Sequence, residues 1–244
     1  MNGTSGFQEV RSSTSRSPSY RYRFLHEQRH RFGTGAWHLY LAIQVLSFLL
    51  LWLPCLSSSS QAQTPPITPS GLNTQIDLSA TPPAGKVQYD ITGGTRPGGG
   101  LNLYHSFGEL GVPANNIANF LNGVSFDLNG NPLAAGLQTS NILGSVTGGN
   151  ISNIFGTIQT TGFGNANLFL MNPAGFLFGP NATVNVGGMV AFTSADYLRL
   201  SELNGSNAGI FHADPAQASI LTNAPVAAFG FLGSNPGAIT VQGS

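Results

Sequence analysis

Two histidines and a few carboxylates are the side chains beyond residue 62 that could take part in acid–base or metal chemistry. His105 could act as a general base or a metal ligand, but both roles need partners, and His212 is the only other histidine in this part of the chain. Polysaccharide cleavage needs two nearby carboxylates, or a carboxylate with a Lys or Arg. The closest acids in the sequence, Asp196 and Glu202, lie six positions apart. We therefore expect His105 to be a packing residue and the chain not to be an enzyme.

Phosphate and nucleic-acid chemistry are also poorly supported by the composition. Residues 93–100 are rich in glycine, but no Lys-Ser or Lys-Thr follows them, as a phosphate-binding loop requires. From Gln63 onward three basic residues stand against seven acidic ones, a balance of 3 − 7 = −4. Such a chain lacks the cations that track a phosphate backbone. We expect no nucleic-acid partner, no metal and no cofactor.

The first 62 residues have the pattern of an export signal. Six of the nine basic residues precede position 32, an apolar run covers residues 37–56, and small residues lead to Ala62. This pattern predicts an extended signal peptide at 1–62, handled by the Sec machinery and cleaved between Ala62 and Gln63. An uncleaved membrane anchor is the alternative, because about 18–20 apolar residues can span a bilayer. The single cysteine, Cys55, lies inside this segment, so the mature chain would form no disulfide.

The elements that position the remaining residues are predicted to be strands. After a Pro-rich leader at 63–70, short apolar runs alternate with turns of Gly, Asn and Pro, which is typical of an all-β fold. One short helix is expected at 195–203, behind an N-cap at Ser194. Strands are expected at 75–78, 87–91, 101–107, 123–128, 142–146, 154–159, 167–171, 176–178, 182–186 and 189–193.

The spacing of these strands favours a solenoid. A sandwich or barrel usually has longer strands that alternate in polarity, whereas short strands with Asn and Gly corners suit coils that stack on one another. Asn tolerates the left-handed backbone conformation of such corners, and it can stack on an equivalent Asn one coil away. We predict a right-handed parallel β-helix at 71–244. The region before residue 140 would be an irregular N-terminal cap that protects the first strand edge.

Four stretches of the chain resemble one known family in the same order. The string Asn172-Pro-Ala-Gly175 is similar to the Asn-Pro-Asn-Gly-Ile signature of the two-partner secretion domain, also called the haemagglutination activity domain, of filamentous-haemagglutinin-type exoproteins. Ala174, Phe176 and Ile151 stand where the family usually has Asn, Ile and Pro. The resemblance covers residues 71–244, and its other stretches are 102–107, 142–150 with 152–156, and 189–196.

The resemblance implies a secretion-targeting and interaction module. The periplasmic domains and barrel of a partner outer-membrane transporter would recognise and export it, so that the protein is secreted or stays on the cell surface. The chain would be the truncated N-terminal part of a larger adhesin, whose host or surface ligand is unknown. A β-helix lyase or glycosidase and an inert matrix protein are the alternatives. The resemblance assigns structural and transporter-recognition roles to Asn102, His105, Ser106, Phe107, Gly148, Gly149, Asn150, Asn172, Pro173, Gly175, Phe178 and Gly179.

The turn at residues 172–175 is expected to act mainly through the fold. Gly175 would supply a positive backbone torsion that other residues adopt only at a cost. Asn172 would satisfy backbone groups at the corner that otherwise lack partners. We therefore predict that this turn supports secretion by fixing one coil, and only secondarily by touching the transporter.

Overall fold

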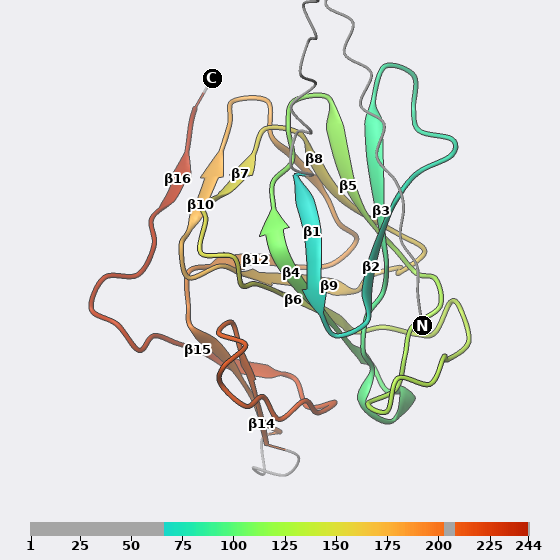
Figure 1. Cartoon of the computed structure of the whole chain (residues 1–244), viewed down its shortest axis with the longest axis vertical. Coiled ribbons are helices and arrows are strands. Elements are labelled where there is room, and N and C mark those ends of the chain that lie inside the picture. Colours follow the sequence, from blue (N-terminus) through green and yellow to red (C-terminus); the bar gives the residue numbers. More distant parts are fainter. Residues whose placement is uncertain (1–65, 203–207, 244) are drawn as a thin grey trace, which may run out of the picture. The chain divides into compact units, whose positions relative to one another are not determined.

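The computed structural model describes residues 66–202 and 208–243, which form short strands joined by turns and loops (Figure 1). The expected signal segment at 1–62, its cleavage site between Ala62 and Gln63, and leader residues 63–65 lie outside these ranges. The described residues contain sixteen strands and one 3-10 turn, which confirms the all-β prediction. None of the helical structure in the described ranges is long and apolar enough to span a membrane.

The strands are between three and nine residues long and belong to four sheets. In chain order they are β1 (Ile67–Gly71), β2 (Thr74–Leu78), β3 (Val87–Gly93), β4 (Asn102–Leu110), β5 (Asn116–Leu121), β6 (Asn141–Val146), β7 (Ser152–Ile154), β8 (Thr157–Thr161), β9 (Asn167–Met171), β10 (Phe176–Phe178), β11 (Thr183–Asn185), β12 (Val190–Thr193), β13 (Tyr197–Leu200), β14 (Gly209–His212), β15 (Val226–Gly230) and β16 (Ile239–Val241). Sheet A has the order β1-β4-β6-β9-β12, and sheet B the order β11-β8-β5-β3-β2. Sheet C has the order β16-β10-β7, and sheet D the order β14-β13-β15.

Successive segments of the chain, called courses below, each contribute one strand to sheet A, one to sheet C and one to sheet B. β6, β7 and β8 enter sheets A, C and B in that order, and β9, β10 and β11 repeat it. The repeats are parallel and in register, so that Ser152 pairs with Phe176 in sheet C and Thr157 pairs with Thr183 in sheet B. Residues from all three sheets therefore share one apolar core, which includes Leu103, Ile142, Leu168, Ile91, Phe120, Ile158, Ile154 and Phe176.

The amino-terminal end differs from the irregular cap predicted before residue 140. β1 covers β4 and β2 covers β3 in antiparallel fashion, but β3, β4 and β5 already belong to the parallel sheets. β5 lies outside every expected strand, and β1 begins at Ile67, inside the expected leader. The expected strand at 123–128 is absent, because Asp127 accepts hydrogen bonds from the peptide N–H groups of Asn129 and Asn131 and fixes a turn.

The helix predicted at 195–203 is wrong, since β13 occupies this part of the chain. Leu198 and Leu200 are buried, whereas Arg199 between them is exposed, which is the two-residue period of a strand. β13 pairs with β14 and β15 in sheet D. Its buried leucines join a second apolar cluster with Tyr104, Leu143 and Phe169 of sheet A. Burial against sheet A therefore overrides the local helical pattern.

Candidate functional site

Three asparagines form a ladder at the start of three neighbouring strands of sheet A. Asn102, Asn141 and Asn167 are in register in β4, β6 and β9. Asn141 Nδ2 donates to Asn102 Oδ1 at 2.8 Å, and Asn167 Nδ2 donates to Asn141 Oδ1 at 3.0 Å. The expectation that corner asparagines stack on one another is thus confirmed. Each of the three is followed by an apolar residue. Asn141 lies directly before the expected strand at 142–146, whereas Asn102 and Asn167 lie within the expected strands at 101–107 and 167–171.

The two ends of the asparagine ladder are closed by backbone groups. Asn102 Nδ2 donates to the carbonyl oxygens of Thr222 at 2.9 Å and Ala224 at 2.7 Å, and the Tyr104 hydroxyl donates to the Thr222 carbonyl at 2.6 Å. At the other end, the Met189 N–H donates to Asn167 Oδ1 at 2.9 Å. Asn102 is fully buried. The family-motif residue Asn102 therefore joins β4 to a segment 120 residues further along the chain.

Asn172 joins the corner between β9 and β10 to the segment at 150–152. Its Nδ2 donates to the Asn150 carbonyl and to Ser152 Oγ, both at 2.9 Å, and its Oδ1 accepts from the Ala174 N–H at 2.9 Å. The side chain is fully buried. The expected role of Asn172 in satisfying backbone groups at this corner is confirmed.

Gly175 has the positive φ that the turn was predicted to need, at 99°. A Cβ at this position would overlap the carbonyl oxygen of Ala238. The Gly237 N–H donates to the Pro173 carbonyl at 3.0 Å, and the Phe176 N–H donates to the Ala238 carbonyl at 3.0 Å. The segment that leads into β16 thus lies directly against the turn, and Gly175 permits this approach.

The glycine pair of the second motif forms an exposed turn. Gly148, Gly149 and Asn150 are all exposed, and Gly149 has a φ of 77°. Asn150 Nδ2 donates to Glu109 Oε1 at 2.7 Å. A Cβ on Gly148 would overlap the Gly108 carbonyl oxygen, so this glycine is required for the close approach of two courses. Among the twelve predicted motif residues, these three are the exposed ones.

His105 lies inside the apolar core, in agreement with a packing role. Its ring centroid is 6.0 Å from that of Phe107 and 5.7 Å from that of Phe120, and Nδ1 has no hydrogen-bond partner among the described residues. Burial, and to a smaller extent the nearby positive charge of Arg96, lowers the pKa of His105 to about 3. The imidazole is therefore neutral at physiological pH. No group of three or more His, Cys, Asp or Glu residues in the described ranges could hold a metal ion.

The other motif residues also face the interior or a neighbouring course. Ser106 Oγ lies 2.7 Å from Ser70 Oγ, and the Ser106 N–H donates to Thr74 Oγ1 at 2.9 Å, which ties β4 to the strands that cover it. The Phe178 ring stacks on that of Phe176 at a centroid distance of 6.1 Å and meets that of Phe192 edge to face at 4.7 Å. Gly179 leaves room for the ring of Phe155, which a Cβ would overlap. These positions hold the fold.

Arg96 is a buried cation whose role the sequence did not suggest. Its guanidinium donates to Ser125 Oγ at 3.0 Å, the Gly100 carbonyl at 3.1 Å and Thr139 Oγ1 at 2.6 Å. Burial lowers its pKa to about 10, so it remains charged at neutral pH. These bonds join the glycine-rich stretch to the irregular segment at 122–140. The sequence offered one signal for this role: Arg96 lies within the glycine-rich stretch at 93–100, in a part of the chain with only three basic residues.

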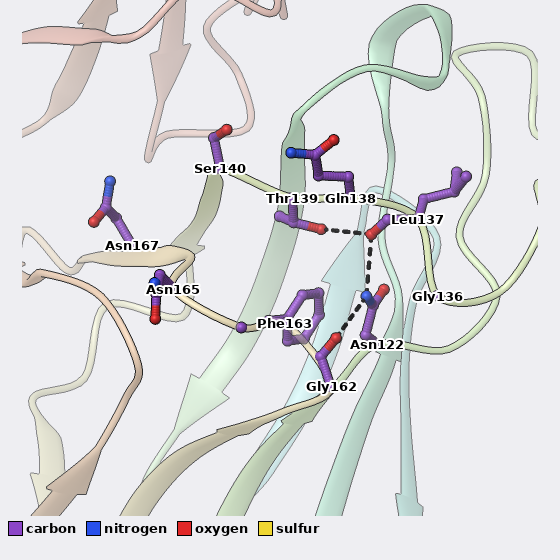
Figure 2. Close-up of a pocket in the computed structure, with 11 residues that line it drawn as sticks. Asn122, Gly136, Leu137, Gln138, Thr139, Ser140, Gly162, Phe163, Asn165 and Asn167 are labelled. Carbon is purple, nitrogen blue, oxygen red and sulfur yellow. Dashed lines mark hydrogen bonds between the residues drawn. The ribbon is translucent and has the colours of Figure 1, made fainter.

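A depression of about 570 Å³ lies where the segment at 136–140 meets the corner at 162–167 (Figure 2). Asn122 is one of the lining residues, and its Nδ2 donates to the carbonyl oxygens of Leu137 and Gly162, both at 3.0 Å. Amide, hydroxyl and glycine groups form most of the lining, together with Phe163, and none of the lining residues carries a charge. The chemistry available there is hydrogen bonding. None of the predicted motif residues lines this depression.

The protein is all-β, with parallel strands that follow one another in each sheet and antiparallel strands β1 and β2 at the amino-terminal end. Most of its motif residues join segments that lie in neighbouring strands or corners. The sequence matches the TPS secretion domain family over residues 59–244, and the chain belongs to that family. This confirms the resemblance to the two-partner secretion domain. The chain thus carries the secretion domain of a two-partner exoprotein, a class that is secreted across the outer membrane with a partner transporter.

One relative is the 16S rRNA endonuclease CdiA of Enterobacter cloacae subsp. cloacae. The two sequences are 32% identical over 174 residues. The match covers 66% of this chain but 5% of that protein, so the chain corresponds to a small part of the relative's length.

Proposed function

We propose that this chain is the secretion-targeting and interaction module of a larger exoprotein, which the periplasmic domains of a partner transporter recognise after Sec-dependent export. Family membership over residues 59–244 is the observation that carries the proposal. The expected signal peptide at 1–62 supplies the first membrane crossing. Absence of cysteine after Cys55 supports the second, because no disulfide would block an unfolded chain.

The described strands support a right-handed parallel β-helix as the folded form. Sheets A, B and C each receive one strand from successive courses, as the coils of a solenoid would supply them. The antiparallel strands β1 and β2 would then be the N-terminal cap. Folding by stacking of coils needs no cofactor and no cross-link, which suits a protein that folds after it leaves the transporter.

The full-length exoprotein would be an adhesin with a surface ligand, and the module itself would have no catalytic activity. His105 supports this reading, because it is enclosed by phenylalanine rings and cannot meet a substrate. Asp196 accepts from the Leu232 N–H at 2.6 Å, which gives this carboxylate a local structural role. An activity screen on acidic polysaccharides tests the enzymatic alternative.

Secretion with the co-encoded transporter is the direct test of the proposed function. Cells that express the chain with this transporter should release it into the medium, and cells without the transporter should retain it in the periplasm. Mass spectrometry of the released protein should find an N-terminus close to Gln63. Release that does not depend on the transporter would contradict the proposal, and an intact segment at 1–56 would contradict the cleavage.

A further inference from the structure

Asparagine followed by glycine is a pair of residues at which a protein chain can modify itself. The peptide nitrogen of the glycine attacks the carbon of the side-chain amide, and glycine has no side chain that obstructs this approach. The described ranges contain two such pairs, Asn122-Gly123 and Asn129-Gly130. Both pairs have the same residue types, so their surroundings decide which of them reacts.

Asn129 lies in an exposed turn with its side chain free. The Gly130 N–H donates to the Asp127 carbonyl at 3.1 Å and closes the turn, and Gly130 has a φ of 79°. The Asn129 N–H donates to Asp127 Oδ1 at 2.8 Å, but the Asn129 side chain makes no hydrogen bond among the described residues. Asn129 and Gly130 are both exposed, and a Cβ at Gly130 would meet no atom within 4 Å. No described residue therefore holds the Asn129 amide or crowds the nitrogen that attacks it.

Asn122 is also followed by glycine, but its amide is fixed. The side chain is partly buried, and its Nδ2 donates to the carbonyl oxygens of Leu137 and Gly162, both at 3.0 Å. The Asn122 N–H donates to the Thr161 carbonyl at 3.0 Å, so the backbone is anchored as well. Because Nδ2 leaves as ammonia in the reaction, both side-chain bonds would have to break first.

Asn131 lies in the same turn as Asn129 but lacks the attacking nitrogen. It is exposed, but the residue after it is Pro132, whose nitrogen carries no hydrogen and cannot form the ring. Its Nδ2 also donates to Asp127 Oδ2 at 2.9 Å. Asn129 is thus the asparagine of this turn that combines a free amide with an unobstructed peptide nitrogen.

We infer that Asn129 is a site of spontaneous modification, at which the folded chain converts its own asparagine to isoaspartate and aspartate without an enzyme. The Gly130 nitrogen forms a bond to Cγ of Asn129, the Cγ–Nδ2 bond breaks, and the proton of the peptide nitrogen leaves with Nδ2 as ammonia. The product is a succinimide ring. Water then opens the ring at either carbonyl, which gives aspartate or, with Cβ and Cγ now in the main chain, isoaspartate. No electrons are transferred, and water is the sole co-reactant.

The modification changes both the charge and the backbone of the turn. Either product places a second carboxylate close to Asp127. Isoaspartate also adds one main-chain atom between the Asn129 Cα and the Gly130 nitrogen. The hydrogen bonds that Asp127 accepts from the N–H groups of Gly130 and Asn131 then cannot both keep their lengths. The modification therefore marks the age of a chain and loosens this turn, while the strands of the four sheets keep their pairing.

Peptide mapping by mass spectrometry tests the inference on the full chain, purified in its folded form and incubated in heavy-oxygen water at mildly alkaline pH. Asn129 should convert to a mixture in which isoaspartate exceeds aspartate, with uptake of heavy oxygen. Asn122 should convert about tenfold or more slowly, because two hydrogen bonds hold its amide, and Asn131 should stay intact.

Two controls separate the effect of the fold from that of the sequence. In the urea-unfolded chain, Asn122 and Asn129 should convert at similar rates, because the bonds that hold the Asn122 amide are lost. Gly130→Ala should slow the conversion of Asn129 in both the folded and the unfolded chain and leave that of Asn122 unchanged.

Each outcome supports or overturns the inference. Faster conversion of Asn129 than of Asn122 in the folded chain, with similar rates in urea, supports it. An Asn129 that stays intact while the unfolded chain converts overturns it, as does an Asn122 that matches the rate of Asn129 in the folded chain. Conversion of Asn129 to aspartate without isoaspartate would indicate direct hydrolysis by water and overturn the attack by Gly130.

Discussion

Replacement of Asn172 by alanine tests whether the family-motif turn acts through the fold. The substitution leaves three groups without their present partner: Ser152 Oγ, whose bond to Asn172 is buried, and the Asn150 carbonyl and the Ala174 N–H, whose bonds are partly buried. A buried polar group without a partner costs about 1–3 kcal/mol, and partial relaxation makes the sum smaller than three separate costs. We expect the free energy of unfolding to fall by about 3 kcal/mol.

Thermal unfolding and secretion yield, measured together, give the decisive comparison for Asn172→Ala. A loss of about 3 kcal/mol corresponds to a melting temperature lower by about 6–12 °C in a domain of this size. Asn165→Ala is the control, because Asn165 is exposed and its side chain makes no hydrogen bond among the described residues; it should change neither readout. If Asn172→Ala stopped secretion while melting stayed unchanged, the turn would be a recognition signal first, and our reasoning would be refuted.

Three further changes probe other features of the structure. Gly175→Ala should destabilise by about 3 kcal/mol or more in urea unfolding, because it combines a positive φ with an overlap, whereas Gly164→Ala, at φ 59° in open space, should cost about 1 kcal/mol. Asn141→Asp keeps the acceptor but loses the donor to Asn102, so it should lower the melting temperature, and an unchanged value would disprove the ladder's contribution. His105 has a folded-state pKa lowered from 6.5 to about 3. As the pH falls below about 6.5, His105 is protonated in the unfolded state but stays neutral in the folded state. The free energy of unfolding should therefore fall by up to about 1.4 kcal/mol per pH unit from about pH 6.5 towards pH 3. His105→Leu should flatten this slope above pH 5, where most carboxylates do not titrate, and a slope that persisted would contradict the assignment.

Corners could be predicted from the sequence because few residues satisfy their backbone geometry. Gly175 and Asn172 behave as expected, since a positive φ and a buried cluster of peptide groups leave little choice of residue type. The all-β class could also be predicted, because turns of Gly, Asn and Pro separate short apolar runs along the chain. Stacking of asparagines was expected in general, but the partners Asn102, Asn141 and Asn167 emerged only from the register of sheet A.

Features that depend on distant contacts were missed for a physical reason. The segment around Leu198 fits a helix or a strand locally, and contact with the outer face of sheet A decides for the strand. Arg96 looked like one of three dispersed cations, but four of its hydrogen bonds reach loops and side chains as far as Thr139. The exposure of a motif residue such as Asn150 could not be predicted, because it depends on how distant segments of the chain pack against one another.

The asparagine ladder has a consequence for how such a chain can change in evolution. The rung from Asn102 to Asn141 spans 39 residues and the rung from Asn141 to Asn167 spans 26, yet both make the same hydrogen bond. Each rung offers one donor on one side and one acceptor on the other, whatever length of chain lies between. Insertions and deletions between rungs therefore leave the joints intact, whereas a further rung after Asn167 would have to displace the Met189 N–H that closes the ladder.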